Sequence, residues 1–519
     1  MKKQTLRAIE MDEAISAVQS VDVERVALSK RLKPGTRKKL GQFMTPSNIA
    51  TFMASMFAHE HPSVRLLDAG AGMGSLLAAY VDRACAINSS ERHISATAIE
   101  LDPVLARRAQ ATLTECEAQC HQSGLQFSGK LIEQDFIRYA AQLGRNGSKF
   151  DERLLPQFDA IILNPPYTKV RTRSQHSRLL RQMGIAATNL YSAFVSIALK
   201  TLRPGGELVA IVPRSFCNGP YFTQFRQTLL SQLSLRRIHI YESRSQAFGD
   251  DGVLQENVIV YAVKDSQRPQ TIRITTTRSQ DEGHAPNREM PYTRVVRPHD
   301  INSFIHLPTS DEDHALADFV LRQPCSLTSL GLTVSTGRVV DFRARSHLRT
   351  RSSSASVPLI YAGNFNNGFV AWPRRSKKAN AIHAALATRQ LMVPNEIYVL
   401  TKRFTSKEER RRVVACVYEP GRLSGTFSVV GFENHLNYFH ADGRGLTPDL
   451  ARGLAAYLNS TAVDRYFRQF SGHTQVNATD LRSLRYPSIA ELERMGATIG
   501  DRVADQAAVD AAAFGLSVS

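Results

Sequence analysis

Residues 63–86 have the sequence SVRLLDAGAGMGSLLAAYVDRACA, which is typical of a β-strand that enters a glycine-rich turn and leaves it as an α-helix. The apolar run ends at Asp68, and glycines follow at positions 70, 72 and 74. Glycines let a backbone approach a bound ligand closely, and the first turn of the helix offers free N–H groups. A turn of this kind also occurs in dinucleotide-binding proteins, so alone it predicts a ligand site without naming the ligand.

The alternation of strand and helix continues after this turn. Apolar runs of strand length occur at residues 94–102, 125–136, 158–167, 205–213, 235–243 and 257–263, and helical patterns separate most of them. This order predicts parallel βαβ units, and therefore a doubly wound, Rossmann-like α/β sheet.

A chain of 519 residues is expected to form two or three domains. We expect a helical segment at 1–40, the sheet domain at 41–265, a polar linker at 266–315 and a separate mixed α/β domain at 316–519.

The charge of the chain indicates a polyanionic partner. Lys and Arg number 65 against 47 Asp and Glu, a formal net charge of +18. Residues 321–486 hold 24 basic and 10 acidic residues, and the runs 29–39 and 169–181 hold no acid at all. Each short run taken alone also fits an ordinary solvated surface.

Targeting and metal-binding signals are not expected from this sequence. No run of 18 apolar residues occurs and the first 18 residues are amphipathic, so we expect a cytoplasmic protein that does not enter a membrane. Six cysteines are scattered without C-x-x-C pairs, which predicts no disulfide framework and no thiolate metal site.

Acidic residues end three successive predicted strands. Asp68 ends the first, Glu100 the second, and Asp135 with Phe136 the third. In an open α/β sheet ligands bind at this carboxyl edge, where Glu100 can accept both hydroxyls of a ribose, and Asp135 with Phe136 suits an adenine ring. Taken singly, Asp68 could instead be a cap, Glu100 a surface acid and Asp135 the N-cap of the next turn.

The fourth strand ends in Asn164-Pro165-Pro166-Tyr167. Neither proline has an N–H for the strand ladder, so the chain must turn there. We expect the Asn164 side-chain oxygen and the Pro165 carbonyl to point outward together, as two acceptors for an exocyclic NH2 group. Tyr167 would offer a flat surface on which a base can stack. The alternative is a proline turn with a packed tyrosine.

The order of these motifs resembles that of the gamma class of S-adenosylmethionine-dependent DNA adenine-N6 methyltransferases from type II restriction-modification systems. The matching motifs are GQFMTP (41–46), DAGAGMG (68–74), AIELD (98–102), QDF (134–136) and NPPY (164–167). The glycine turn departs slightly from the family pattern, because Ala69-Gly70 replaces Pro-Ala. The resemblance implies a class I methyltransferase sheet with a C-terminal target-recognition domain for DNA.

Site residues follow from that resemblance. The cofactor S-adenosylmethionine would be bound by Phe43, Thr45, Pro46, Asp68, Gly70, Gly72, Glu100, Leu101, Asp135 and Phe136. The catalytic residues would be Asn164, Pro165, Pro166 and Tyr167, with Phe248 against the other face of the base unless it is a core residue. From the basic segments, double-stranded DNA would be contacted by Lys169, Arg171, Arg173, Arg338, Arg374, Arg375, Lys377 and Lys378.

The resemblance implies transfer of a methyl group to N6 of an adenine flipped out of the duplex, which would protect the site from a cognate restriction endonuclease. A monomer is expected because the chain would carry its own recognition domain. Two alternatives stay open: methylation of protein glutamine or of RNA amino groups, and a non-catalytic DNA-specificity subunit.

Overall fold

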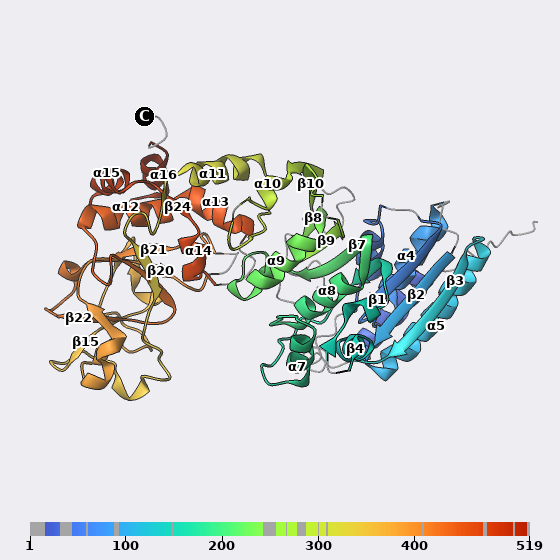
Figure 1. The fold of residues 1–519 in the computed structure, drawn as a ribbon. Helices are drawn as coiled ribbons and strands as arrows, with labels where there is room; N and C mark the ends of the chain where they lie inside the picture. Colours follow the sequence, from blue (N-terminus) through green and yellow to red (C-terminus); the bar gives the residue numbers. More distant parts are fainter. Residues whose placement is uncertain are drawn as a thin grey trace, which may run out of the picture. The chain divides into compact units, whose positions relative to one another are not determined.

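The structure is a computed structural model that describes residues 16–31, 44–58, 61–87, 93–147, 149–241, 256–265, 267–277, 287–298, 300–307, 310–405, 409–470, 475–501 and 504–515. The chain forms two compact units, Met1–Phe304 and Ile305–Ser519 (Figure 1).

The N-terminal unit is built on one nine-stranded sheet. The strands lie in the order β11 (Asn287–Pro291), β10 (Thr271–Thr277), β8 (Ser234–Tyr241), β9 (Asn257–Val263), β7 (Leu202–Pro213), β6 (Phe158–Leu163), β1 (Ser63–Ala69), β2 (His93–Glu100) and β3 (Gln126–Glu133). The five strands from β7 to β3 are parallel, and β9 runs antiparallel to both of its neighbours. The predicted α/β sheet is therefore confirmed.

Helices cover both faces of this sheet. Alternate residues of β6, Ala160 and Ile162, belong to the core beneath α1 (Ala17–Arg31), α3 (Ser47–Ala54), α4 (Ser75–Ala86) and α5 (Pro103–Gln122). Ile161 and Leu163, which alternate with them along the strand, are also fully buried and point to the opposite face, where α8 (Leu190–Thr201) packs on β6 and β7. Smaller elements complete the unit: α6 (Phe136–Leu143), β4 (Arg145–Asn146), β5 (Lys149–Phe150), α7 (Gln175–Gln182), α9 (Thr223–Gln232) and α10 (Tyr292–Val295).

The sheet extends beyond the predicted boundary at residue 265. Strands β10 and β11 both fall within 266–315, the range expected to be a linker, and β10 pairs in parallel with β8. In β10, Ile272 and Ile274 are buried while Thr271 and Arg273 are exposed. The alternation of buried and exposed residues that is typical of a strand is thus present. It is hard to recognise in the sequence because threonine and arginine occupy many of the positions.

Two small sheets form the C-terminal unit with their own core. One sheet has the order β13 (Thr333–Thr336), β23 (Leu436–His440), β20 (Tyr398–Lys402), β21 (Ala415–Tyr418), β17 (Phe369–Val370) and β16 (Phe365–Asn366). The other has the order β14 (Leu348–Arg349), β18 (Ala381–His383), β15 (Ser356–Ile360), β22 (Val429–Phe432) and β19 (Met392–Pro394), while β12 (Cys325–Ser326) pairs with β24 (Arg485–Tyr486). Buried aromatic rings, among them Tyr398, Phe432 and Tyr438, fill the core together with Trp372.

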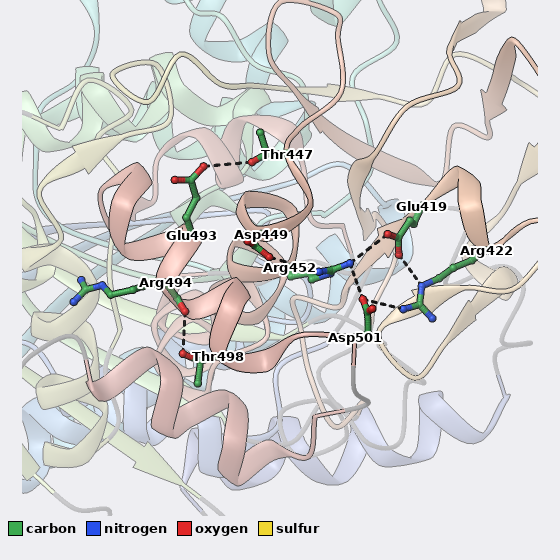
Figure 2. A network of polar contacts seen from close by, with 9 residues as sticks. All are labelled: Glu419, Arg422, Thr447, Asp449, Arg452, Glu493, Arg494, Thr498 and Asp501. Carbon is green, nitrogen blue, oxygen red and sulfur yellow. Dashed lines mark hydrogen bonds and ion pairs between the residues drawn. The ribbon is translucent and has the colours of Figure 1, made fainter.

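Helices make up the rest of the C-terminal unit: α11 (Asp311–Arg322), α12 (Pro448–Leu458), α13 (Thr461–Phe470), α14 (Ala478–Arg482), α15 (Ile489–Ile499) and α16 (Gln506–Phe514). Helices α12 and α15 cross at Gly453 and Gly496, where a Cβ atom on either glycine would lie within 2 Å of a backbone oxygen of the other helix. Arg452 of α12 forms ion pairs with Glu419, Asp449 and Asp501, as Figure 2 shows. The backbones of the two helices therefore touch directly, beside a network of charged side chains.

Candidate active site

A cavity of about 180 Å³ opens at the carboxyl ends of β1, β2, β3 and β6 in the N-terminal unit. Its lining includes nine of the residues predicted for the site: Thr45, Gly70, Gly72, Glu100, Leu101, Asp135, Phe136, Asn164 and Pro166. The cofactor and catalytic motifs, which are far apart in the sequence, thus meet around one space.

The glycine turn forms one wall of this cavity. Gly70, Gly72 and Gly74 have φ angles of 76°, 58° and 87°, a region that residues with a Cβ rarely adopt. The N–H groups of Gly70 and Ala71 donate to the Ile99 carbonyl, which fixes the turn against β2. No atom lies within 4 Å of the place where a Gly72 Cβ would stand, so a side chain there would enter open space beside the wall.

Two acids lie under the turn. Glu100 is buried and accepts hydrogen bonds from the N–H groups of Gly72, Leu101 and Asp102, each 2.8 Å long. Burial is the main cause that raises its pKa. Glu100 therefore supports the turn and borders the cavity at the same time.

Asp68 lies deeper than expected and does not line the cavity. Its side chain is fully buried, and neither carboxylate oxygen has a well-formed hydrogen bond within the described part of the chain. Burial, and then the nearby charge of Glu100, raise the pKa of Asp68 to about 8, although the Leu77 N–H offsets part of this. A cationic group at this end of the cavity would favour the ionised forms of the two acids and so lower their raised pKa values.

Asp135 and Phe136 lie at the end of the cavity beside β3. Asp135 is the N-cap of α6 and accepts from the Arg138 N–H at 2.9 Å, as the alternative interpretation predicted. It also lines the cavity, so the two interpretations do not exclude each other. Its other oxygen lies 2.8 Å from Nε2 of His176. Burial would raise the pKa of Asp135, but the hydrogen bonds and positive charges of His176 and Arg138 outweigh it and hold the pKa below its ordinary value.

Asn164 faces the cavity from the end of β6 and is held by two hydroxyls. Its Nδ2 donates to Oγ1 of Thr45 at 3.0 Å, and its Oδ1 accepts from the Tyr167 hydroxyl at 3.3 Å. An amide oxygen has two lone pairs and can therefore accept two hydrogen bonds. Burial raises the pKa of Tyr167 far above its ordinary value, so the hydroxyl stays a donor.

Tyr167 differs from the expectation of an open stacking surface. The side chain is only 7% exposed, and its ring meets Tyr191 of α8 edge-on at 6.3 Å. The proline turn directs it toward the core and not into the cavity. Pro165 and Pro46 are likewise not part of the lining, and Pro46 is the N-cap residue of α3. The predicted residues Phe43 and Phe248 lie outside the described residues.

Several lining residues were not predicted. Met44 precedes Thr45, His176 lies in α7, and Leu190 and Phe194 lie in α8. The ring of Phe194 packs at 5.1 Å from that of Phe136. Met44 could have been found from its place in the GQFMTP motif, whereas the α7 and α8 residues depend on how the segment after NPPY returns to the sheet.

The predicted DNA contacts after NPPY are accessible. Lys169, Arg171 and Arg173 are all exposed. They begin a loop whose two ends are joined by backbone hydrogen bonds, from Val170 N–H to the Thr188 carbonyl and from Leu190 N–H to the Thr168 carbonyl, each 2.8 Å long.

The predicted DNA contacts of the C-terminal unit are exposed as well: Arg338, Arg374, Arg375, Lys377 and Lys378. Asp341 connects the two segments that carry them, because it accepts from the Tyr361 hydroxyl at 2.9 Å and pairs with Lys378 at 2.7 Å. These residues therefore belong to neighbouring loops of one unit.

The described residues form neither a metal-binding cluster nor a membrane-spanning helix. Across the described ranges, no cluster of three or more His, Cys, Asp or Glu side chains is suited to hold a metal ion. In the same part of the chain, no helix has the length and apolar character needed to cross a membrane.

Comparison with known proteins names the family. The chain is 43% identical over 474 residues to the type II methyltransferase M.PstI of Providencia stuartii. The aligned region covers 91% of this chain and 92% of that protein. The chain belongs to the type II methyltransferases. It is also 41% identical to the type II methyltransferase M.BsuBI of Bacillus subtilis, again over 91% of this chain and 92% of the relative. The model of the Eco57I restriction-modification methylase family matches residues 99–248.

Solved structures agree with this fold. The type IIL restriction-modification enzyme MmeI in complex with DNA is similar with a TM-score of 0.53 at 12% identity, over 93% of this chain and 68% of that one. The predicted cofactor, S-adenosylmethionine, is confirmed by membership of this methyltransferase family, and DNA is the substrate class of its restriction-modification relatives. The alternatives of a protein or RNA methyltransferase and of a non-catalytic subunit are not supported.

The cavity of this type II methyltransferase suits that cofactor. Asp68, with no well-formed hydrogen bond in the described chain, and Glu100 would ionise more readily beside a ligand that carries positive charge, as the sulfonium and amino groups of the cofactor do. The open space beside Gly72 and the flat ring of Phe136 suit a nucleoside.

Proposed function

We propose that this type II methyltransferase methylates N6 of adenine in double-stranded DNA. The observation that carries the proposal is the Asn164 amide, which borders the cofactor cavity at the end of β6 and is held in place by Thr45 and Tyr167. An amide oxygen followed by a proline peptide provides acceptors for an NH2 group and no competing backbone N–H donor.

Each residue would have a separate task. Asn164 Oδ1 and the Pro165 carbonyl would accept the two hydrogens of the adenine amine, which draws its lone pair out of conjugation with the ring. Thr45 would fix the amide so that its oxygen, and not its nitrogen, faces the amine. Glu100 would hold the ribose of the cofactor, and Asp135 and Phe136 its adenine. When bound, S-adenosylmethionine supplies an electrophilic methyl group.

The position of Asn164 supports a target base that leaves the duplex. The amide lies on the wall of a partly enclosed cavity, which a stacked base cannot enter. Flipping costs a few kcal/mol of unstacking, and contacts in the cavity and to the phosphates would offset this. Lys169, Arg171 and Arg173 would hold phosphates near the flipped nucleotide, and the basic loops of the C-terminal unit would hold the recognition sequence. Tyr167 would act through Asn164, because its buried ring does not line the cavity, and stacking by Phe248 stays a prediction.

The test is methyl transfer by Asn164→Ala, with Asn146→Ala of the exposed β4 turn as the matched control. Each protein is incubated with labelled S-adenosylmethionine and plasmid DNA, and the modified bases are mapped by sequencing. We expect Asn164→Ala to lose at least about 100-fold in turnover while it still binds cofactor and DNA, and the control to modify adenines as the wild type does. Near wild-type turnover by Asn164→Ala, or methyl groups on cytosine, would contradict the proposal.

Two further parts of the proposal concern partners. Modification by this enzyme would protect its site from a cognate restriction endonuclease, so a plasmid treated with the enzyme should resist the nuclease that recognises the mapped sequence. We also propose that the enzyme acts as a monomer, for which light scattering should give a mass near 57.6 kDa. A mass of twice that value would contradict the monomer.

A further inference from the structure

We propose that His176 is a positioning residue for cofactor binding, which holds the Asp135 carboxylate in the orientation that accepts the adenine amino group. Through His176, helix α7 becomes part of the cofactor site. The inference rests on the proposed role of Asp135 in binding adenine.

The geometry around Asp135 leaves little freedom to the carboxylate. One oxygen accepts from the Arg138 N–H at 2.9 Å and the other lies 2.8 Å from His176 Nε2. A carboxylate has about four lone-pair sites, so each oxygen keeps capacity for a ligand after these two bonds. Without His176, the bond at the helix N-cap would be the one that remains among the described residues, and the carboxylate could rotate about it.

His176 belongs to the site and not only to the packing of α7. Its side chain is 30% exposed, lines the same cavity as Asp135 and Phe136, and approaches from a different element of the chain. A residue needed solely to fold α7 would not have to reach the cavity. The hydrogen bonds and charges of His176 and Arg138 also keep Asp135 ionised, which is the form that accepts a hydrogen from an amine.

A second contact ties α7 to the same place. Arg138 of α6 donates to the Gln175 side-chain oxygen at 2.7 Å, next to the His176 contact. Helix α7 itself starts at the N-cap Ser174, directly after the basic residues Arg171 and Arg173. The loop from residue 168 to 190 is thus joined to the sheet domain at its base and at the first turn of α7.

The experiment measures the affinity of the wild type and of four variants for two ligands. The ligands are S-adenosylhomocysteine and S-inosylhomocysteine, in which a carbonyl oxygen replaces the adenine amino group. The variants are His176→Leu, which removes the donor, His176→Gln, which restores an amide N–H, Asp135→Asn, and His121→Leu, a matched control at an exposed histidine of α5. Binding is measured by titration calorimetry on the full chain, after thermal unfolding has shown that each variant is folded.

We expect His176→Leu and Asp135→Asn to weaken the binding of S-adenosylhomocysteine by about tenfold or more, and His176→Gln to weaken it by less than about threefold. S-inosylhomocysteine should bind weakly to the wild type and show little further loss in either variant, since the group that Asp135 recognises is already missing. In methylation assays His176→Leu should raise the KM for the cofactor and leave kcat within about twofold. The control should match the wild type throughout.

Other outcomes separate the two ideas. The positioning role is wrong if Asp135→Asn weakens the binding of S-adenosylhomocysteine but His176→Leu does not. It is also wrong if His176→Leu lowers the affinity for both ligands equally. In either case the role of Asp135 stands. If Asp135→Asn leaves the affinity for S-adenosylhomocysteine unchanged, the proposed adenine contact itself is wrong.

Discussion

Substitution of Gly453 by alanine tests the close crossing of α12 and α15. A Cβ atom at this position would lie 1.7 Å from the Leu492 carbonyl oxygen, whereas real Cβ contacts are essentially never below 3.0 Å. The two helices would have to separate by about 1.3 Å, the difference between these distances, which is a large shift for a packed interior. A Cβ atom on Gly496 would likewise lie 1.8 Å from the Asp449 carbonyl oxygen.

Two physical effects oppose each other at this position. Alanine is favoured over glycine inside a helix by about 1 kcal/mol, so helix propensity alone predicts a more stable protein. Overpacking costs about 1–3 kcal/mol and sometimes more, and because the obstacle is backbone we take the upper part of this range. The net expectation is a loss of about 2 kcal/mol in the free energy of unfolding of the C-terminal unit.

The single tryptophan makes this loss measurable. Trp372 is buried in the core of the C-terminal unit, so its fluorescence reports the unfolding of that unit in urea. Gly421→Ala is the matched control, because no atom lies within 4 Å of its Cβ position, and it should change stability by less than about 0.5 kcal/mol. A Gly453→Ala protein that unfolds at the wild-type urea concentration, or above it, would refute the reasoning.

Three further predictions concern the catalytic unit. The raised pKa of Asp68 means that the folded state keeps its proton between about pH 4 and pH 8 while the unfolded state has lost it, so stability falls across this range as pH rises. Asp68→Asn should therefore stabilise the cofactor-free protein more at pH 8 than at pH 5 in urea unfolding followed by circular dichroism; a gain that is equal at both values would contradict this. Thr45→Val removes the acceptor of the Asn164 amide and should lower kcat by about tenfold in single-turnover assays with saturating cofactor, and an unchanged kcat would show that Asn164 needs no such support. Replacing Arg171 and Arg173 by alanine should reduce the slope of log affinity for duplex DNA against log salt by about 2, since each lost phosphate contact releases about 0.9 counterion fewer; an unchanged slope would place these residues away from the DNA.

The sequence could predict those parts of the fold that depend on local patterns. The seven strands expected between residues 63 and 263 are present, and the glycine turn adopts the positive φ angles that its glycines suggest. Strands β10 and β11 were not predicted, because threonine and arginine obscure an alternation that only pairing with β8 makes meaningful.

The candidate site was predictable at its motifs but not in the directions of its side chains. Asp68 and Tyr167 belong to recognisable motifs, yet both are buried and neither lines the cavity. His176 belongs to a run that reads only as basic, and its contact with Asp135 spans 41 residues. Such contacts depend on how a loop folds back on the sheet, which no local pattern in one sequence encodes.

The hydrogen bond between Thr45 and Asn164 joins residues 119 positions apart, on either side of β1, β2 and β3. Both residues line the cofactor cavity, so a complete cavity exists only in the folded unit. Ligands that bind only the folded state stabilise it by mass action, by about 2.7 kcal/mol at 100 times the Kd. The methyl donor would therefore stabilise the folded enzyme as well as take part in its reaction.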